Sequence, residues 1–185
     1  MIELLDALID LEGDFNLHAA RLLILMKAFG GRKGDKKIRG LTKVVKLDFL
    51  LRYPVYFERA LKSVGTSPDS IYVKDYERRS IESSMVRYRY GPWDPRYRAF
   101  INYLVGKGLA EVEIQLNTIL IGLTPKGVQY ANNISKENEF QDIVSRSKIL
   151  KKNFDWGAMN LKNFIYQTFP EILSLEMGET IKYEF

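Results

Sequence analysis

Residues 97–133 carry the pattern that most restricts the fold of this 185-residue chain. Apolar side chains at positions 97, 100, 101 and 104 fall on one face of a helix, which the glycines at 106 and 108 would end. Apolar and polar residues then alternate through 110–116 and 119–123, as in two strands joined by a tight turn. Thr124 and Pro125 are suited to an N-cap and a first helical position, so a helix follows. The pattern predicts a helix, a β-hairpin and a helix in succession, and we expect the apolar side chains at 110, 112, 114, 119 and 121 of the hairpin to pack on the apolar face of the first helix.

Further helices are predicted on both sides of this unit. Helices, a two-stranded wing and a closing helix, in this order, are typical of a winged-helix domain. We therefore predict a mainly α fold with a small β-hairpin: a winged-helix core over residues 1–134, with N-terminal helices, and a C-terminal helical extension and tail over residues 135–185. The additional helices are expected over residues 4–11, where Gly13 would end the first, and over 16–29, 41–52, 55–64, 140–154 and 161–169.

Three stretches give weaker signals. Residues 32–40 are rich in charge and glycine and are expected to form a loop, as are residues 66–84, which have few apolar anchors. Val86, Tyr88 and Tyr90 alternate with arginines, which indicates a half-exposed strand. Gly91-Pro92 is expected to end that strand.

The composition excludes several classes of protein. The chain has no cysteine, so it contains no disulfide, no thiolate zinc site and no thiol nucleophile. Its first residues are acidic where a signal peptide is basic, and the apolar run Leu22 to Met26 is too short to cross a bilayer. We expect a cytoplasmic protein that does not associate with membranes.

No group of residues offers catalytic chemistry. His18 is the single histidine, and it lies among apolar residues of a helix, as a structural histidine does. Glu111-Val-Glu113 lacks the lysine of the Glu-x-Lys pattern found in a common class of metal-dependent nuclease. The glycines at 30, 31 and 34 lack the Gly-Lys-Ser/Thr ending of a phosphate-binding loop. We expect a protein that is not an enzyme, with no catalytic residue, metal or cofactor.

The charge distribution indicates where an anion would bind. Residues 1–26 hold five acidic and one basic side chain, whereas residues 27–62 hold eleven basic and three acidic ones. A basic middle region is explained equally well by a solvated surface or by contact with nucleic acid. The candidate contacts to DNA phosphates are Lys33, Lys36, Lys37, Arg39, Lys43, Arg87, Arg89, Arg96 and Arg98, with aromatic residues interleaved among the last four.

A protein partner is the other candidate ligand. Glu111 and Glu113 lie on the outward side of the predicted wing, where they would repel phosphates and favour a protein surface. The predicted helix 140–154 has an apolar face that suits either its own domain or the groove of a partner. The candidate interface residues are Glu111, Glu113, Phe140, Ile143, Val144 and Leu150.

Three segments resemble the middle component of bacterial ABC three-component systems, which include Lamassu-type anti-phage defence. The segments are LTKVVKLDFLLRYPVYFERAL (41–61), YRYGPWDPRYRAFINYLVGKGLAEV (88–112) and LTPKG (123–127), and together they cover about the middle half of the chain. The run from Leu47 to Pro54 is the most specific part. The second segment is shared more loosely with winged-helix proteins of defence and toxin-antitoxin loci.

The resemblance implies a small accessory subunit without catalytic residues. Its partners would be an SMC- or Rad50-like ATPase and a separate effector subunit, often a nuclease. The alternative is a stand-alone winged-helix DNA-binding regulator or antitoxin, which the basic clusters and an isoelectric point near 9.2 favour.

Overall fold

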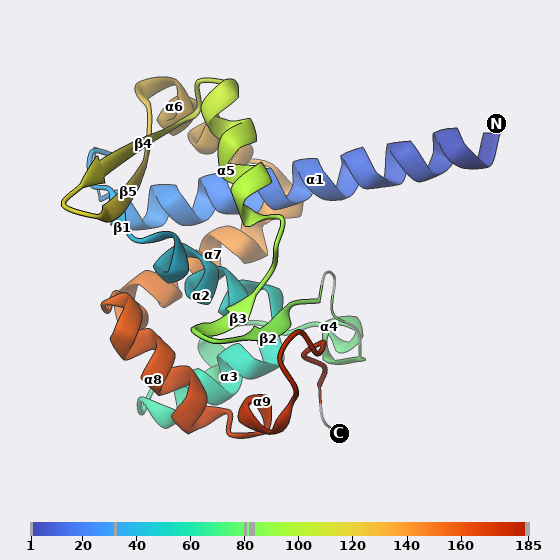
Figure 1. Cartoon of the computed structure of the whole chain (residues 1–185), viewed down its shortest axis with the longest axis vertical. Coiled ribbons are helices and arrows are strands. Elements are labelled where there is room, and N and C mark those ends of the chain that lie inside the picture. The colour runs from blue at the N-terminus through green and yellow to red at the C-terminus, as the bar shows by residue number, and fades with distance from the viewer. Residues whose placement is uncertain (1, 32, 80, 82–83, 184–185) are drawn as a thin grey trace.

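Helix α1 (Ile2–Phe29) spans 28 residues of the computed structural model, which describes residues 2–31, 33–79, 81 and 84–183, with residues 2–14 described by their backbone alone. The prediction that Gly13 separates two helices is wrong. A glycine inside a helix costs about 1 kcal/mol relative to alanine, which burial of the following turns outweighs. The predicted apolar stripe over 4–11 lies outside the described side chains. The N-terminal turns of α1 extend away from the rest of the chain (Figure 1).

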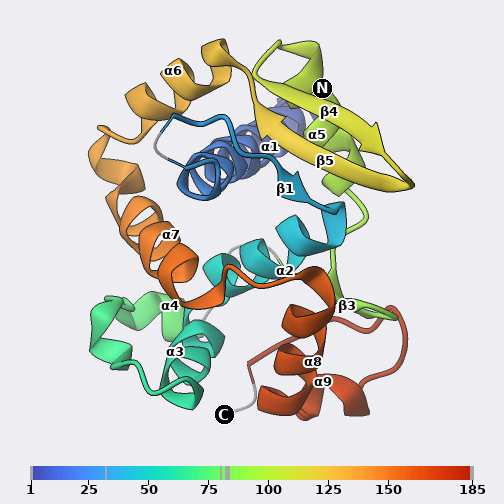
Figure 2. The ribbon, with the colours of Figure 1, turned by 90° about the vertical axis from the view of Figure 1, so that its left-hand side faces the viewer.

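The C-terminal half of α1 lies at the centre of the fold. Seen end-on, it is surrounded by α2 (Leu41–Arg52), α5 (Tyr97–Gly106), α6 (Pro125–Ile134) and α7 (Gln141–Phe154) (Figure 2). The residues from Leu22 to Met26 are all buried. A helix that is apolar around its circumference must be enclosed in this way.

The predicted hairpin forms two strands of an antiparallel sheet. Its order is β1-β5-β4, with β1 (Ile38–Arg39), β4 (Ala110–Gln115) and β5 (Thr118–Leu123). The prediction that 32–40 is entirely a loop is wrong at its end, because Ile38 pairs with Ile121 and Arg39 with Leu120. Helices α5 and α6 flank the hairpin in the predicted order.

Helices α2 and α3 (Pro54–Ser63) match their predicted positions, with Pro54 in the first turn of α3. The 66–84 stretch, predicted as loop, contains the short helices η1 (Pro68–Ser70) and α4 (Asp75–Arg79). The strand expected from Val86 does end before Gly91, but Gly91 and Pro92 themselves belong to a second strand. Gly91 takes φ +117°, which lets the chain turn after β2 (Val86–Tyr88) and begin β3 (Gly91–Trp93). Pro92 is tolerated because the two-stranded sheet consists of edges.

The C-terminal helices share the core of the N-terminal ones. Helix α7 packs on α1 and α2, and α8 (Ala158–Thr168) packs on α2 and α3; η2 (Asn138–Phe140) and α9 (Glu171–Ser174) flank them. Leu150, Phe154 and Leu161 belong to the same buried cluster as the apolar residues of α1–α3. The core therefore runs across the boundary predicted at residues 134 and 135.

The tail after α9 lies against α3. The hydroxyl groups of Tyr53 and Tyr56 donate hydrogen bonds to the carbonyl oxygens of Ile181 and Lys182, each at 3.0 Å. Thr180 forms an isolated antiparallel bridge with Val86. The described part of the chain is mainly helical with a small antiparallel sheet, and none of its helices is long and apolar enough to cross a membrane.

Candidate functional site

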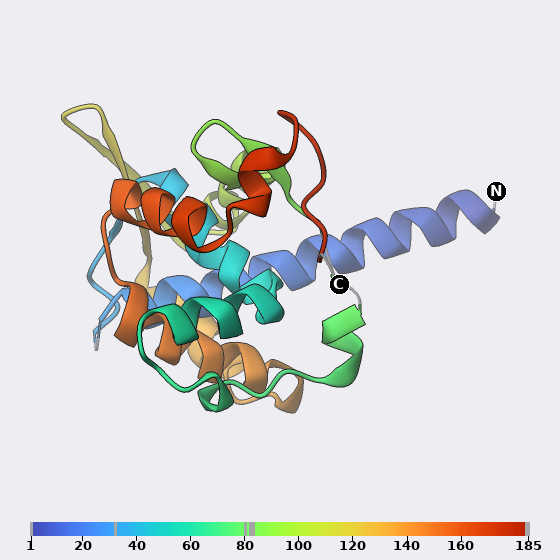
Figure 3. The same ribbon diagram turned by 90° about the horizontal axis from the view of Figure 1, so that it is seen from below.

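The β4–β5 hairpin projects from the body of the molecule at the end opposite to the N-terminus of α1 (Figures 1 and 3). Its base is buried at Ala110, Ile121 and Leu123. Val112, Ile114 and Ile119 were expected to pack on α5, but they are 43%, 76% and 40% exposed. That expectation is wrong because the apolar alternation continues into the part of the hairpin that projects beyond the body of the molecule (Figure 1).

The turn of this hairpin is unusual in its residues. Leu116 and Asn117 both have a left-handed backbone, with φ of 46° and 62°, and Leu116 is 91% exposed. Glycine, asparagine and aspartate are the residues that such a turn favours, and a bulky side chain there is strained. Leu116 therefore combines an unfavourable backbone conformation with little packing against the described part of the chain. We call Val112, Ile114, Leu116 and Ile119 the hairpin tip.

The predicted partner residues Glu111 and Glu113 and the predicted DNA contact Lys37 bind one another. Lys37 Nζ lies 2.9 Å from a carboxylate oxygen of each glutamate. The hydrogen bonds that Lys37 donates to Glu113 and then to Glu111 raise the pKa of Lys37. The lysine stem crosses Gly122, where a Cβ atom would come within 2.8 Å of Lys37 Cγ. The outward side of the hairpin is therefore less acidic than the sequence indicated.

Some side chains of the first predicted basic cluster are paired with acids of the same chain, and the others are exposed. Lys43 pairs with Asp155 at 2.7 Å, and its side chain is 13% exposed. Lys33, Lys36 and Arg39 are exposed. These three lysine and arginine side chains remain as candidate phosphate contacts, whereas Lys37 and Lys43 are engaged within the chain.

The second predicted basic cluster divides in the same way. Arg96 is held by Asp94, with Nη2 2.9 Å from Oδ2 and Nε 3.1 Å from Oδ1. Arg87 is half-buried in β2. Arg89 is exposed, with its guanidinium 5.4 Å from the centroid of the Tyr90 ring, and Arg98 is exposed on the first turn of α5. Arg89 and Arg98 are exposed, whereas the Arg96 side chain, although 41% exposed, is engaged by Asp94.

The apolar face of α7 covers the protein's own core. Leu150 is fully buried, which contradicts its place in the predicted partner interface. Phe140, Ile143 and Val144 are half-buried. The reason is that α7 lies against α1 and α2, so the intramolecular alternative holds for this helix.

The two longer motif segments meet in a buried ionic network, which no sequence pattern indicated. Asp48 accepts hydrogen bonds from Arg21 Nε at 2.7 Å, from Arg52 Nε at 2.8 Å and from the Tyr97 hydroxyl. Arg52 Nη1 also donates to Asp94 Oδ2 at 2.7 Å. Arg21, Asp48, Arg52 and Asp94 are each 3% exposed or less. The network joins α1, α2 and the start of α5.

The network fixes the charge state of its carboxylates. Burial alone would raise the pKa of Asp48, but the charges of Arg21 and Arg52 outweigh burial and hold that pKa well below its ordinary value. Asp94 is likewise opposed by burial, yet its hydrogen bonds from Arg96 and Arg52 lower its pKa to about 2. Burial raises the pKa of Tyr97. His18, also fully buried, contacts Arg21 and the ring of Phe100. Each side chain is held by another, as in a structural network rather than a catalytic site.

Hydrogen bonds in the short LTPKG segment hold the start of α6 against the turn after α5. The Thr124 side chain accepts a hydrogen bond from the backbone N–H of Gly127 at 3.0 Å and donates one to the carbonyl of Gly108 at 2.7 Å. A Cβ atom at Gly127 would meet the Leu109 carbonyl oxygen at 1.8 Å, so glycine is required there. The three motif segments therefore supply much of the frame of the protein.

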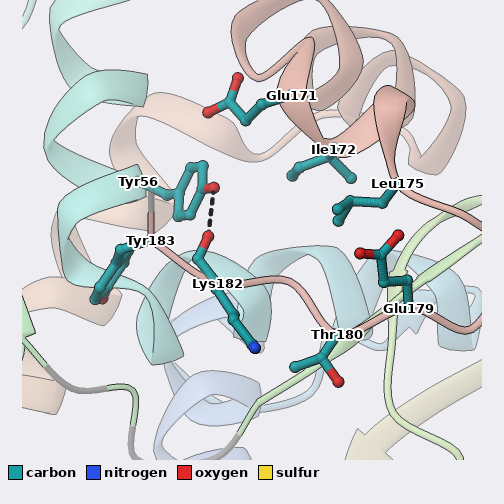
Figure 4. Close-up of a pocket in the computed structure, with 8 residues that line it drawn as sticks. All are labelled: Tyr56, Glu171, Ile172, Leu175, Glu179, Thr180, Lys182 and Tyr183. Atoms are coloured by element: carbon teal, nitrogen blue, oxygen red, sulfur yellow. Dashed lines mark hydrogen bonds between the residues drawn. The ribbon is translucent and has the colours of Figure 1, made fainter. Parts of the chain in front are cut away.

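A cavity of about 410 Å³ lies between α3, α9 and the tail (Figure 4). Its acidic side chains are engaged in the fold, because Glu171 pairs with Arg59 and Glu179 accepts a hydrogen bond from the backbone N–H of Glu176. Within the described residues, no three histidine, aspartate or glutamate side chains gather as a metal site would require. The cavity offers neither a nucleophile with a base nor a set of metal ligands.

Comparison with models of protein families, with curated proteins and with solved structures gave no match to this chain.

Proposed function

We propose that the chain is a non-catalytic accessory subunit with a winged-helix core, in which β4–β5 is the wing and the hairpin tip binds a partner protein. The resemblance of its motifs favours a place in a bacterial anti-phage defence complex, beside an SMC- or Rad50-like ATPase and an effector nuclease. In this proposal the subunit links the two and contributes no catalytic residue.

The hairpin tip is the observation that carries this proposal. Four apolar side chains, each at least 40% exposed, project together on one two-stranded element. One of them, Leu116, is kept in a backbone conformation that penalises it. Exposed apolar groups that gather in one place favour a protein surface over phosphates, which require cations. The neighbouring glutamates, already paired with Lys37, are suited to the polar rim of such an interface.

Pull-down of the tagged protein from cells that carry its intact locus tests the proposal. We expect stoichiometric recovery of an ATPase, and loss of that recovery with Ile114→Asp. The matched control is Met177→Asp, at a residue that is 58% exposed in the tail. Both variants should keep the melting temperature of the wild type. A monodisperse protein that is recovered alone, and that functions fully when the rest of the locus is deleted, would overturn the proposal.

A stand-alone DNA-binding regulator or antitoxin is the second candidate. It is favoured by Lys33, Lys36 and Arg39, which are exposed close to the sheet, and by Arg98 on α5, the helix in the recognition position of a winged helix. Specific binding of the isolated protein to an operator in its own locus would support it.

A further inference from the structure

The turn between β2 and β3 presents aromatic rings at the surface. Tyr88 and Tyr90 are 47% and 45% exposed, and Trp93 is half-buried. The ring centroids of Tyr88 and Trp93 are 5.8 Å apart, and Trp93 in turn contacts the fully buried ring of Tyr97 at 6.0 Å. The exposed rings are thus held on a short hairpin that is anchored in the core.

Two hollows lie beside this turn and share one ring. The first, of about 190 Å³, is lined by Tyr88, Tyr90, Trp93 and Arg98 among others. The second, of about 210 Å³, lies between Tyr90 and α8 and is lined by Met159 and Lys162. Tyr90 and Thr42 border both. A planar group can therefore stack beside Tyr90 in either hollow.

Positive charge surrounds these rings. The Arg89 guanidinium lies 5.4 Å and Lys162 Nζ 6.0 Å from the centroid of Tyr90. In the part of the chain that the structure describes, neither hollow is lined by a carboxylate, and Arg89, Arg98 and Lys162 form no ion pair. Other surface cations, such as Lys37 and Lys43, are paired with acids.

Lys46 lies next to this turn, and its pKa reflects the same excess of positive charge. Its stem lies against Gly91, where a Cβ atom would come within 3.3 Å of Lys46 Cε. Burial and then the charge of Lys162 lower the pKa of Lys46 to about 8. An anion bound in the neighbouring hollow would offset this repulsion.

We propose that Tyr88, Tyr90 and Trp93 form a platform that binds single-stranded nucleic acid, with bases stacked on the rings and phosphates bound by Arg89, Arg98 and Lys162. Unpaired bases expose the faces that stacking requires, whereas the bases of a duplex are stacked on one another. Stacking tolerates any sequence because each base has a π-face. The site is distinct from the hairpin tip, so it adds a ligand to the proposed subunit and does not depend on that proposal.

Fluorescence anisotropy of the full-length protein with labelled oligonucleotides tests this proposal. The probes are single-stranded DNA and RNA of about 15 nucleotides and a DNA duplex of the same length. We expect tighter binding of the single strands, and an affinity lowered about 5- to 100-fold by Tyr90→Ala. Arg98→Glu and Lys162→Glu should each weaken binding and make the salt dependence less steep, because each removes a phosphate contact.

Two tyrosine variants serve as controls. Tyr90→Phe keeps the ring and should bind like the wild type. Tyr72→Ala removes a ring that is 73% exposed at another position and should change nothing. If single strands fail to bind at low salt, or if Tyr90→Ala, Arg98→Glu and Lys162→Glu all bind like the wild type, the proposal is wrong. It is also wrong if the duplex binds more tightly and replacement of Lys33, Lys36 and Arg39 by alanine abolishes that binding.

Discussion

The buried network around Asp48 and the hairpin tip depart from the usual distribution of polar and apolar groups in opposite directions. The network places two aspartates and two arginines in the interior, where each finds an opposite charge at 2.7–2.8 Å. The tip exposes four apolar side chains to solvent, by 40% at Ile119 and up to 91% at Leu116. The first departure is explained by contacts within the protein, because buried charges are tolerated when they are paired. The second has no such explanation within the described residues, and for that reason we propose that a partner protein covers it.

Removal of the central carboxylate should have the largest effect. Asp48→Asn leaves Arg21 and Arg52 buried without their shared counter-charge, and we expect a loss of about 3–5 kcal/mol in the free energy of unfolding. Urea unfolding followed by circular dichroism measures this loss. Asp155→Asn, which breaks the pairs of this 40% exposed carboxylate with Lys43 and Lys151, is the control and should cost less than about 1 kcal/mol. Equal costs for the two variants would show that the network does not stabilise the fold as described.

Removal of one hydrogen bond to the same carboxylate should cost less. Tyr97→Phe deletes the hydroxyl that donates to Asp48 but keeps the ring and both arginines. A hydrogen bond to a charged group contributes about 1.5–3 kcal/mol, and we expect a loss in this range in the same unfolding assay. Tyr103→Phe, which loses a bond of 3.3 Å to Asn16 at the surface, should stay within about 0.5 kcal/mol of the wild type. A Tyr97→Phe variant as stable as the wild type would contradict the role given to the hydroxyl.

The network should also govern stability in acid. The folded protein lowers the pKa of Asp94 from 3.8 to about 2. Its contribution is therefore fully present above the ordinary pKa and is lost as the pH falls from about 4 to about 2. Melting temperatures measured across this interval should fall less steeply for Asp94→Asn than for the wild type. Identical slopes would show that Asp94 is not held in its ionised form by Arg52 and Arg96.

The tip should show the smallest effect on stability, with the opposite sign. Leu116→Asn keeps the left-handed turn and replaces a strained leucine by a residue that favours it, so we expect a gain of about 1 kcal/mol. Thermal or urea unfolding detects a change of this size. Ile114→Asn, in the regular part of β4, serves as the control and should lie within about 0.5 kcal/mol of the wild type. A clear loss of stability with Leu116→Asn would mean that the leucine packs within the protein.

Much of the fold could be predicted because the helices and the hairpin have regular apolar periods. The α2 and α5 helices and the hairpin lie where the spacing placed them. Gly13 and Gly91 were misjudged for one reason: a glycine permits a break or a turn, and the tertiary contacts decide which follows. The pairing of β1 with β5 could not be predicted from two residues of a charged stretch.

The candidate surfaces were harder to predict than the fold. Lys37, Glu111 and Glu113 were assigned to different ligands because the sequence separates them, although the sheet brings them together. Alternation placed Ile114 on the inward face, but it cannot show where the core ends. The left-handed φ of Leu116 could not be predicted, because the alternation placed Leu116 in the first strand and the turn at residues 117 and 118, whereas the structure has the turn at Leu116 and Asn117.

Partner recovery with Leu116→Asn tests whether the hairpin tip is the docking surface for the ATPase. The tagged variant and the wild type would be pulled down from cells that carry the intact locus, and the recovered ATPase would be quantified against the bait. We expect the variant to be at least as stable as the wild type and to recover little or no ATPase. Stoichiometric recovery of the ATPase by this variant would contradict the claim that the hairpin tip is the docking surface.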